Sequence, residues 1–183
     1  LQARLDARRP VVLSAGGAPL RFVRQARTPA AFEARYEPRI YLAGEVQVRV
    51  DTWHDFMNAL VWLTFPRAKV ALNERHYEAL LRSREEGRSN RGAIQDALTL
   101  FDEGGVVVAA ADPELLQLLR AFRWKELFVR GRARVTRDMR FYLFGHALYE
   151  KALQPYPGLT GRGILLDVPA DFFRTPIATQ TEI

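Results

Sequence analysis

The chain has 183 residues and a mass of 20.9 kDa, with 48% hydrophobic and 26% charged residues. These proportions are typical of one globular domain with a sizeable core, and they exclude disordered, fibrous and collagen-like proteins. The chain has no cysteine, which excludes disulfides, iron–sulfur clusters, cysteine-ligated zinc and thiol catalysis.

The longest apolar run, residues 106–111, is far shorter than the roughly 20 residues that span a bilayer, so we expect no membrane segment. The first residues are polar and do not resemble the apolar part of an export signal. We therefore expect a single domain over residues 1–183 in the cytoplasm, with a loosely packed tail over residues 170–183.

The net charge of +6 is concentrated in one segment. Residues 120–140 contain eight basic and two acidic residues, which equals the whole net excess of the chain. Such clustering favours an anionic partner over a uniformly basic surface, although a solvated basic face that aids solubility remains the alternative.

In the first half of the chain, alternating residues predict short strands over 20–23 and 46–50, and residues 29–36 have a helix-forming composition that Pro38 interrupts. Asp51 and Thr52 are good N-caps. They predict a helix over residues 53–65 that ends before Pro66, followed by a second helix over residues 67–84.

In the second half, two runs separated by glycines predict a β-hairpin over residues 96–110. Asp112 and Pro113 predict the start of a helix. The remaining expectations are a strand over 130–135, an extended or helical segment over 139–144, a helix over 146–153 and a final strand over 161–168. Together these elements predict an α+β fold in which helices pack against a mostly antiparallel sheet.

The common catalytic signatures are absent from the sequence. There is no Walker A loop, no Gly-x-Gly-x-x-Gly turn, no Gly-x-Ser-x-Gly elbow and no His-Glu-x-x-His. Nucleotide-fold and serine-hydrolase functions are therefore disfavoured, and we expect no metal centre and no tightly bound zinc.

Polar residues are concentrated at one end of the apolar helix over residues 53–65. His54 and Asn58 share one stripe of this helix, and Asp55 lies beside them. Buried without partners, such groups would cost roughly 1 to 3 kcal/mol each. They are therefore either a capping and core-satisfying network or part of an opening to solvent.

His146 and Glu150 are four residues apart, which places them on one face of the predicted helix. This spacing suits a helix-stabilising pair, a proton-transfer dyad or two metal ligands. By contrast, His76 is interpreted as a surface or core histidine.

Asp96 and Asp102 are six residues apart and bracket the first strand of the predicted hairpin, so both would lie on the same face. Carboxylates in this arrangement can act as acid and base or hold a divalent cation. They can equally satisfy turn amides at the strand ends.

Four segments in order resemble the bacterial family called domain of unknown function 3025. They are residues 54–62, residues 65–73 with Phe65-Pro66-Arg67-Ala68-Lys69 and Leu72-Asn73, residues 96–104, and residues 143–151. The resemblance covers about residues 20–170. It implies a single-domain bacterial protein and brings no established activity.

Two hypotheses follow. The leading one is a hydrolase-like acid/base enzyme acting on an anionic substrate, with a shared pocket formed by His54, Asp55, Asn58, Asp96, Asp102, His146 and Glu150. The alternative is a nucleic-acid-binding or ribonucleoprotein-associated module that uses residues 120–140. In that module a row of anion-binding guanidinium groups would come from Arg130, Arg132 and Arg134, which a strand would place on one face.

Overall fold

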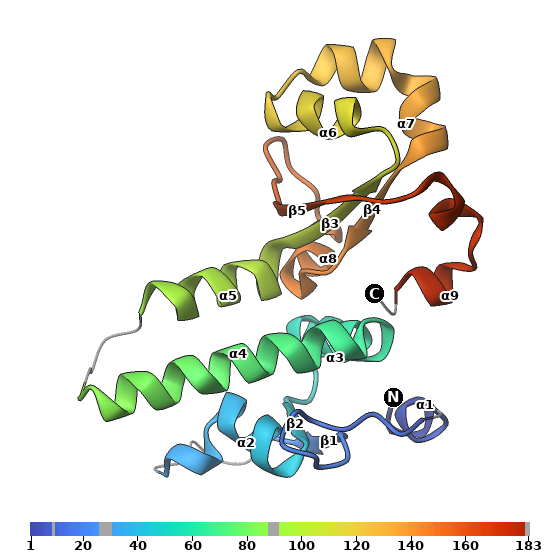
Figure 1. Cartoon of the computed structure of the whole chain (residues 1–183). Coiled ribbons are helices and arrows are strands. Elements are labelled where there is room, and N and C mark those ends of the chain that lie inside the picture. Colours follow the sequence, from blue (N-terminus) through green and yellow to red (C-terminus); the bar gives the residue numbers. More distant parts are fainter. Residues whose placement is uncertain (9, 26–30, 88–91, 182–183) are drawn as a thin grey trace.

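The computed structural model describes residues 1–8, 10–25, 31–87 and 92–181, and it has an α+β fold (Figure 1). The helices are α1 (Gln2–Asp6), α2 (Tyr36–Ala43), α3 (Trp53–Thr64), α4 (Pro66–Glu85), α5 (Ala93–Gly104), α6 (Pro113–Arg120), α7 (Arg132–Asp138), α8 (His146–Ala152) and α9 (Ile177–Gln180). The strands are β1 (Arg21–Arg24), β2 (Glu45–Val48), β3 (Gly105–Ala110), β4 (Met139–Leu143) and β5 (Arg162–Asp167). Short 3-10 turns form η1 (Phe32–Ala34) and η3 (Ala170–Arg174), and η2 (Lys125–Arg130) is π-helical.

The strands form two small sheets, and the prediction of a mostly antiparallel sheet is wrong. β1 pairs with β2 in parallel, and the second sheet has the order β4-β3-β5. In that sheet β3 is antiparallel to β4 and parallel to β5. The parallel pairs follow from crossover connections, because a helix lies between the paired strands in the sequence in both cases.

The predicted hairpin over residues 96–110 is also wrong, because its first half is helical. α5 runs to Gly104 and leads directly into β3. The inward-facing residues of α5 include Gln95, Leu98 and Asp102, which are spaced as one side of a helix rather than in strand alternation. The run of Leu, Thr and Phe at 98–101 resembled a strand in composition only.

Residues 130–135 do not form the predicted strand. They belong to η2 and α7, so the arginines at 130, 132 and 134 do not form one row on a strand face. The side of this segment that faces the core carries Leu127, Gly131 and Val135, which recur every four residues. That period is helical.

Several predicted elements are confirmed. α3, α4, α8 and β5 lie within two residues of their predicted bounds, and the side chain of Asp112 caps α6 by accepting a hydrogen bond from the Glu114 backbone N–H. The segment over 139–144, for which two states were open, is strand β4. Pro38 does not interrupt a helix, because it lies in the first turn of α2, where its missing N–H needs no partner. The first part of the expected 29–36 helix, residues 29–30, lies outside the described residues.

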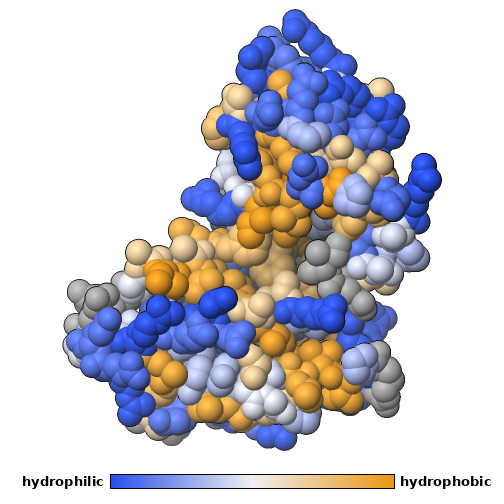
Figure 2. All heavy atoms as spheres, viewed as in Figure 1, coloured by the Kyte–Doolittle hydropathy of each residue, from blue (hydrophilic) through white to orange (hydrophobic). Residues whose placement is uncertain are grey.

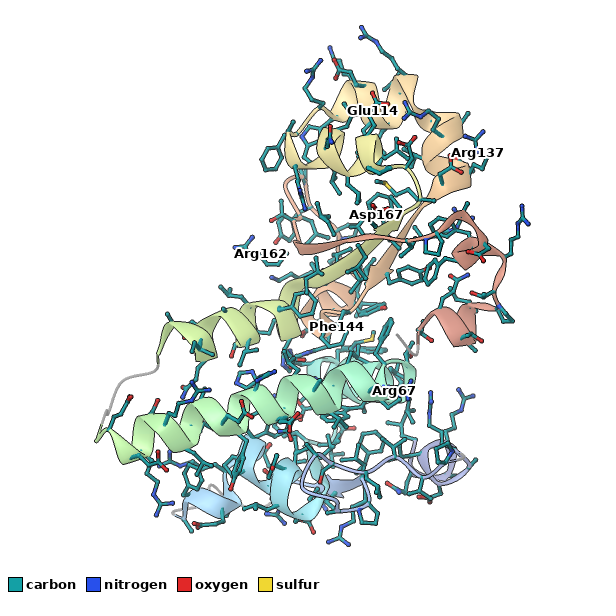
Figure 3. The ribbon with its side chains drawn as sticks, viewed as in Figure 1. Arg67, Glu114, Arg137, Phe144, Arg162 and Asp167 are labelled. Atoms are coloured by element: carbon teal, nitrogen blue, oxygen red, sulfur yellow. The ribbon has the colours of Figure 1, made fainter. Side chains whose placement is uncertain are left out.

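Three clusters of buried apolar side chains hold these elements together. The first joins α1, α2, β1, β2 and α3, and the second joins α6 and η2 to the β4-β3-β5 sheet. Phe144 belongs to the third, between the other two, where it packs against Phe65 and Phe101 (Figure 3). The polar pocket described below lies beside this middle cluster.

The last segment folds back over the second sheet. In η3 and α9 no residue is fully buried, but Gln180 accepts a hydrogen bond from the Tyr142 hydroxyl and Phe173 lies beneath the Arg140 guanidinium. Among the described residues, no helix is long and apolar enough to cross a membrane.

Candidate active site

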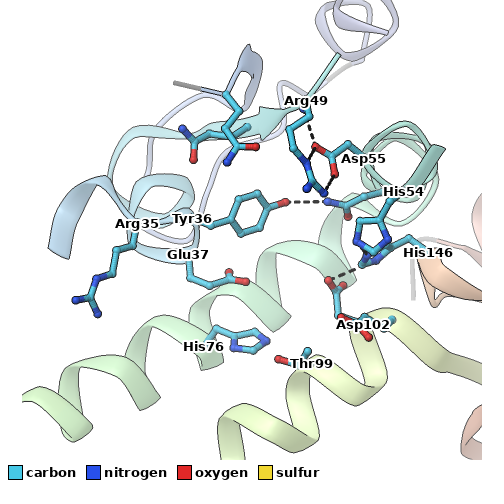
Figure 4. Close-up of a pocket in the computed structure, with 14 residues that line it drawn as sticks. Arg35, Tyr36, Glu37, Arg49, His54, Asp55, His76, Thr99, Asp102 and His146 are labelled. Carbon is cyan, nitrogen blue, oxygen red and sulfur yellow. Dashed lines mark hydrogen bonds and ion pairs between the residues drawn. The ribbon is translucent and has the colours of Figure 1, made fainter. Parts of the chain in front are cut away.

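A polar pocket of about 580 Å³ lies between α2, β2, α3, α4, α5 and α8 (Figure 4). Its wall includes His54, Asp55 and Asn58 from α3, together with Asp102 from α5 and His146 from α8. Some of these residues are far apart in the sequence: His54 and His146 are separated by 92 positions. The structure thus brings most of the expected polar residues to one place.

Two imidazoles form the centre of the site. The Nε2 atoms of His54 and His146 are 3.0 Å apart, and the rings meet edge to face with centroids 4.4 Å apart. On its far side, His54 bonds through Nδ1 to the Glu150 carboxylate at 3.0 Å. The Nδ1 atom of His146 lies 3.6 Å from Oδ2 of Asp102. The result is a line of carboxylate, imidazole, imidazole and carboxylate.

The bonding pattern assigns the protons in this line. Nδ1 of His54 bonds to the Glu150 carboxylate, which only accepts hydrogen bonds, so it carries a hydrogen. Nδ1 of His146 is buried and makes no hydrogen bond among the described residues, but the Asp102 carboxylate 3.6 Å away favours a hydrogen there. The two facing Nε2 atoms then share one further proton, because neither two lone pairs nor two hydrogens fit between atoms 3.0 Å apart. When this proton is present, the four ring nitrogens carry three hydrogens.

The two histidines differ in their exposure to solvent. The side chain of His146 is 5% exposed, whereas that of His54 is 35% exposed and faces the pocket. Burial lowers the pKa of His146 to about 4, and the attraction of the nearby Asp102 carboxylate only partly opposes this shift. His146 is therefore neutral near pH 7.

Lys69 neutralises the buried carboxylate of the line. Its ammonium donates to Asp102 and, at 2.9 Å, to the amide oxygen of Asn58. The amide nitrogen of Asn58 in turn donates to the Tyr36 hydroxyl at 2.8 Å. Burial alone raises the pKa of Asp102, but Lys69 and His146 outweigh it, so this pKa lies below its ordinary value.

Asp55 has a different partner from the other carboxylates. It accepts hydrogen bonds from the backbone N–H of Arg49 and from both Nε and Nη2 of the Arg49 guanidinium. Burial raises the pKa of Asp55, yet these hydrogen bonds outweigh it and hold the pKa below its ordinary value. Asp55 thereby fixes Arg49, which directly follows β2, at the wall of the pocket (Figure 4).

A close backbone approach places His146. Gly145 caps α8, and a Cβ atom at this position would lie 2.4 Å from the carbonyl oxygen of Glu103 and 2.5 Å from the backbone nitrogen of Gly105. The absence of a side chain lets α8 begin against the junction of α5 and β3. This packing sets His146 beside Asp102.

Most of the predicted site residues lie at the pocket, but their hydrogen-bond partners differ from the predicted ones. Glu150 bonds to His54 of α3, and no bond to His146, its neighbour one helical turn away, is present among the described residues. The pair that forms therefore joins two helices, whereas the predicted pair of His146 and Glu150 lay on one helix. Asp96 is exposed and does not line the pocket, because six residues along a helix place it on a different side from Asp102. The arginines at 130, 132 and 134 lie outside the pocket as well.

Sequence reasoning missed several residues of the site. Lys69 and Tyr36 were not considered, and His76 was given a surface or core role although it is buried and lines the pocket. One signal was present, because Lys69, Asn73 and His76 form a polar stripe with helical spacing on the buried side of α4.

Within the described ranges, no group of three or more histidines and carboxylates is arranged to hold a metal ion.

Comparisons with known proteins give a family and no activity. Residues 20–183 match the model of a family described as "Protein of unknown function (DUF3025)", which extends the expected resemblance to the end of the chain. No curated protein and no solved structure matches the chain.

Proposed function

Because the chain belongs to the DUF3025 family, whose function is unknown, we propose an activity from its site alone: an acid/base enzyme of the hydrolase type. The observation that carries the proposal is the line from Glu150 through His54 and His146 to Asp102. Paired imidazoles of unequal burial, each facing a carboxylate, are suited to proton transfer at an accessible edge.

His54 is the residue proposed to exchange protons with the substrate, because it is the histidine that the pocket exposes. With the shared proton present, the charges on Lys69, Asp102, the histidine pair and Glu150 cancel. In this state His54 donates its proton to the leaving group of a scissile bond. Without that proton, His54 Nε2 accepts one from an attacking water, which adds to the electrophilic carbon or phosphorus.

The other members of the line position His54 and adjust its charge. Glu150 holds the Nδ1 hydrogen and fixes the orientation of the ring, and His146 keeps Nε2 of His54 partnered while the pocket is empty. Asp102, neutralised by Lys69, orients His146 in the same way. None of these three needs to contact the substrate.

The proposed substrate is small and carries an anionic group. Arg49 is the cation best placed to bind it, because Asp55 uses Nε and Nη2 and leaves Nη1 with no hydrogen bond among the described residues. The described part of the pocket wall carries four carboxylates. Asp55 and Asp102 are each paired with a cation, Glu37 accepts a hydrogen bond from the Asn73 amide, and the fourth is Glu103. The anionic-substrate hypothesis therefore depends on Arg49 and not on the arginines of residues 120–140.

A hydrolysis panel tests the proposal. The wild-type chain is assayed with p-nitrophenyl acetate, p-nitrophenyl phosphate and bis(p-nitrophenyl) phosphate. For a substrate that is turned over, we expect His54→Gln to lower kcat about 100-fold or more, and Glu150→Gln to lower it about tenfold with little change in KM. Arg49→Lys should raise KM instead.

Glu85→Gln is the matched control, because this exposed carboxylate at the end of α4 lies outside the pocket. It should leave kcat and KM unchanged. Equal activity of His54→Gln and the wild type, in folded proteins, would refute the assignment of His54.

A further inference from the structure

The end of the molecule formed by α6, η2 and α7 lies far from the helices α2, α3 and α4 that help form the pocket (Figure 1). We propose that a row of exposed aromatic rings there, Phe122, Trp124, Phe128 and Phe141, binds single-stranded nucleic acid together with the cations around it. We call this surface the aromatic-basic face. The proposal is independent of the enzymatic function proposed above.

The rings of the row are exposed although they are large and apolar. Phe122 is 72% exposed, Trp124 48%, Phe128 43% and Phe141 40%. Neighbouring Val129 is 72% exposed as well. Single exposed apolar residues need no explanation, but a contiguous group of this kind marks an interaction site.

The rings form a continuous series. Centroids are 5.5 Å apart between Phe122 and Trp124, 6.1 Å between Trp124 and Phe128, and 6.0 Å between Phe128 and Phe141. Trp124 and Phe128 are nearly parallel, at 16°. Successive aromatic side chains of this kind are the platforms on which unpaired bases stack.

Phe122 occupies a backbone position that disfavours a bulky residue. It follows the last turn of α6 with φ 53°, in the left-handed region. Its backbone N–H bonds to the Leu119 carbonyl and the N–H of Arg123 bonds to the Leu118 carbonyl, the pattern of a Schellman motif in which this position is usually glycine. A phenylalanine held there at a conformational cost, with its ring in solvent, is explained by a role in binding rather than in folding.

The cations around the rings are only partly neutralised. Arg123 bonds to Glu126, and Arg134 pairs with Asp112 and Glu114, so these two are engaged within the chain. Three cations that lie near the rings in the sequence, Arg120, Lys125 and Arg132, are exposed and make no ion pair within the described residues. Figure 2 shows hydrophilic residues dominating this end of the molecule on the face drawn.

The combination selects the ligand. Exposed rings can stack on any base, and unpaired cations in the same segment attract a phosphate backbone. Duplex nucleic acid hides its base faces and would use only the cations. We therefore assign the aromatic-basic face to an unpaired strand, RNA or DNA.

Binding is measured by fluorescence anisotropy with labelled 12-nucleotide oligo-U and oligo-dT, and with a 12-base-pair duplex, between 50 and 200 mM salt. The wild type should bind at least one single strand more tightly than the duplex, and more weakly as salt rises. Trp124→Ala should weaken single-strand binding about tenfold, since stacking contributes on the order of 1 to 3 kcal/mol per base.

Two further variants test separately whether binding depends on the Phe122 ring and whether it depends on the cations. Phe122→Gly should weaken binding to a similar extent while Tm stays equal or rises, because glycine suits the left-handed position. A triple variant should lower the steepness of the log–log salt dependence by about 2, because each phosphate contact on a single strand contributes about 0.7. Its substitutions are Arg120→Gln, Lys125→Gln and Arg132→Gln.

Matched controls keep the same changes elsewhere on the surface. Trp53→Ala removes a ring that is 59% exposed and outside the face, and Arg4, Arg24 and Arg174 changed together to Gln remove the same charge. Both should bind like the wild type. No single-strand binding at 50 mM salt, equal loss in the controls, or binding only to anionic vesicles or to a second copy of the chain would each overturn the proposal.

Discussion

The pocket and the aromatic-basic face handle polar and charged groups in opposite ways. In the pocket, charged side chains from different helices are buried and bonded to one another, as with Lys69 and Asp102. At the aromatic-basic face, neighbouring residues of one segment point cations and rings into solvent, as with Lys125 and Phe122.

This contrast has an energetic consequence. A buried charge that loses its partner keeps its full desolvation cost, whereas an exposed one is rehydrated. Substitutions in the pocket should therefore change stability as well as activity. Substitutions on the aromatic-basic face should change binding and alter the free energy of unfolding by no more than about 1 kcal/mol.

The largest effect is expected at Lys69. Lys69→Met leaves Asp102 buried without its cation and should lower the free energy of unfolding by about 3 to 5 kcal/mol. Urea denaturation measures this change. Arg82→Met is the control, because it breaks an exposed pair with Glu78 at 3.8 Å and should cost about 0 to 1 kcal/mol. Equal losses in the two variants would remove the contrast between buried and exposed charges.

A second effect comes from the pH dependence of stability. Below its ordinary pKa of 6.5, His146 takes up a proton in the unfolded chain but stays neutral in the folded chain until about pH 4. Its contribution is therefore complete above pH 6.5 and is lost as pH falls towards 4, by about 3 kcal/mol. Asp55 and Asp102, whose pKa values are lowered, lose their contributions only below about pH 4.

Unfolding measured at several pH values checks this prediction. His146→Gln should flatten the slope between pH 6.5 and 4, whatever its effect on stability at neutral pH. An unchanged slope would show that His146 is not held neutral by burial.

A smaller loss is expected at Gly145. An added methyl group in Gly145→Ala meets the backbone of Glu103 and Gly105, so stability should fall by about 1 to 3 kcal/mol and His146 should shift. Gly92→Ala is the control, because a Cβ there meets open space and the backbone angles suit any residue. Gly158 would not serve, because its φ of 89° disfavours alanine. The prediction fails when Gly145→Ala and Gly92→Ala have the same Tm.

The smallest change should be a gain. Phe122→Gly relieves a left-handed phenylalanine that follows α6, and it should raise the free energy of unfolding by about 1 kcal/mol. Thermal unfolding gives the sign directly. A clear decrease in Tm would mean that the Phe122 ring stabilises the fold, which would weaken the argument for a binding role.

The sequence predicted which residues line the pocket better than it predicted how they are bonded to one another. His54 and Asn58 were identified because polar residues within an apolar helix need partners, and His146 because it lies four residues before Glu150. Asp96 was included wrongly because residues 96–102 were interpreted as a strand, whose period of two places both aspartates on one face. Lys69 was missed because nothing local distinguishes a buried lysine from an exposed one.

The aromatic-basic face shows the reverse. Its charge was evident from composition, but η2 and α7 replaced the predicted strand because Leu127, Gly131 and Val135 repeat with helical spacing, a pattern less visible than the alternating arginines. The sheet topology was equally inaccessible from local patterns. Parallel pairing of β3 with β5 depends on contacts between residues more than 50 positions apart.

The central claim is that Glu150, His54, His146 and Asp102 form one line for proton transfer. Long-range ¹H–¹⁵N correlation spectra of the histidine rings, assigned with His76→Gln, His54→Gln and His146→Gln, test it most directly. Near pH 7 the claim predicts His146 with its hydrogen on Nδ1 and a bare Nε2, and a His54 signal that changes in Glu150→Gln but not in Glu85→Gln. A His146 hydrogen on Nε2, or a His54 signal indifferent to Glu150, would contradict it.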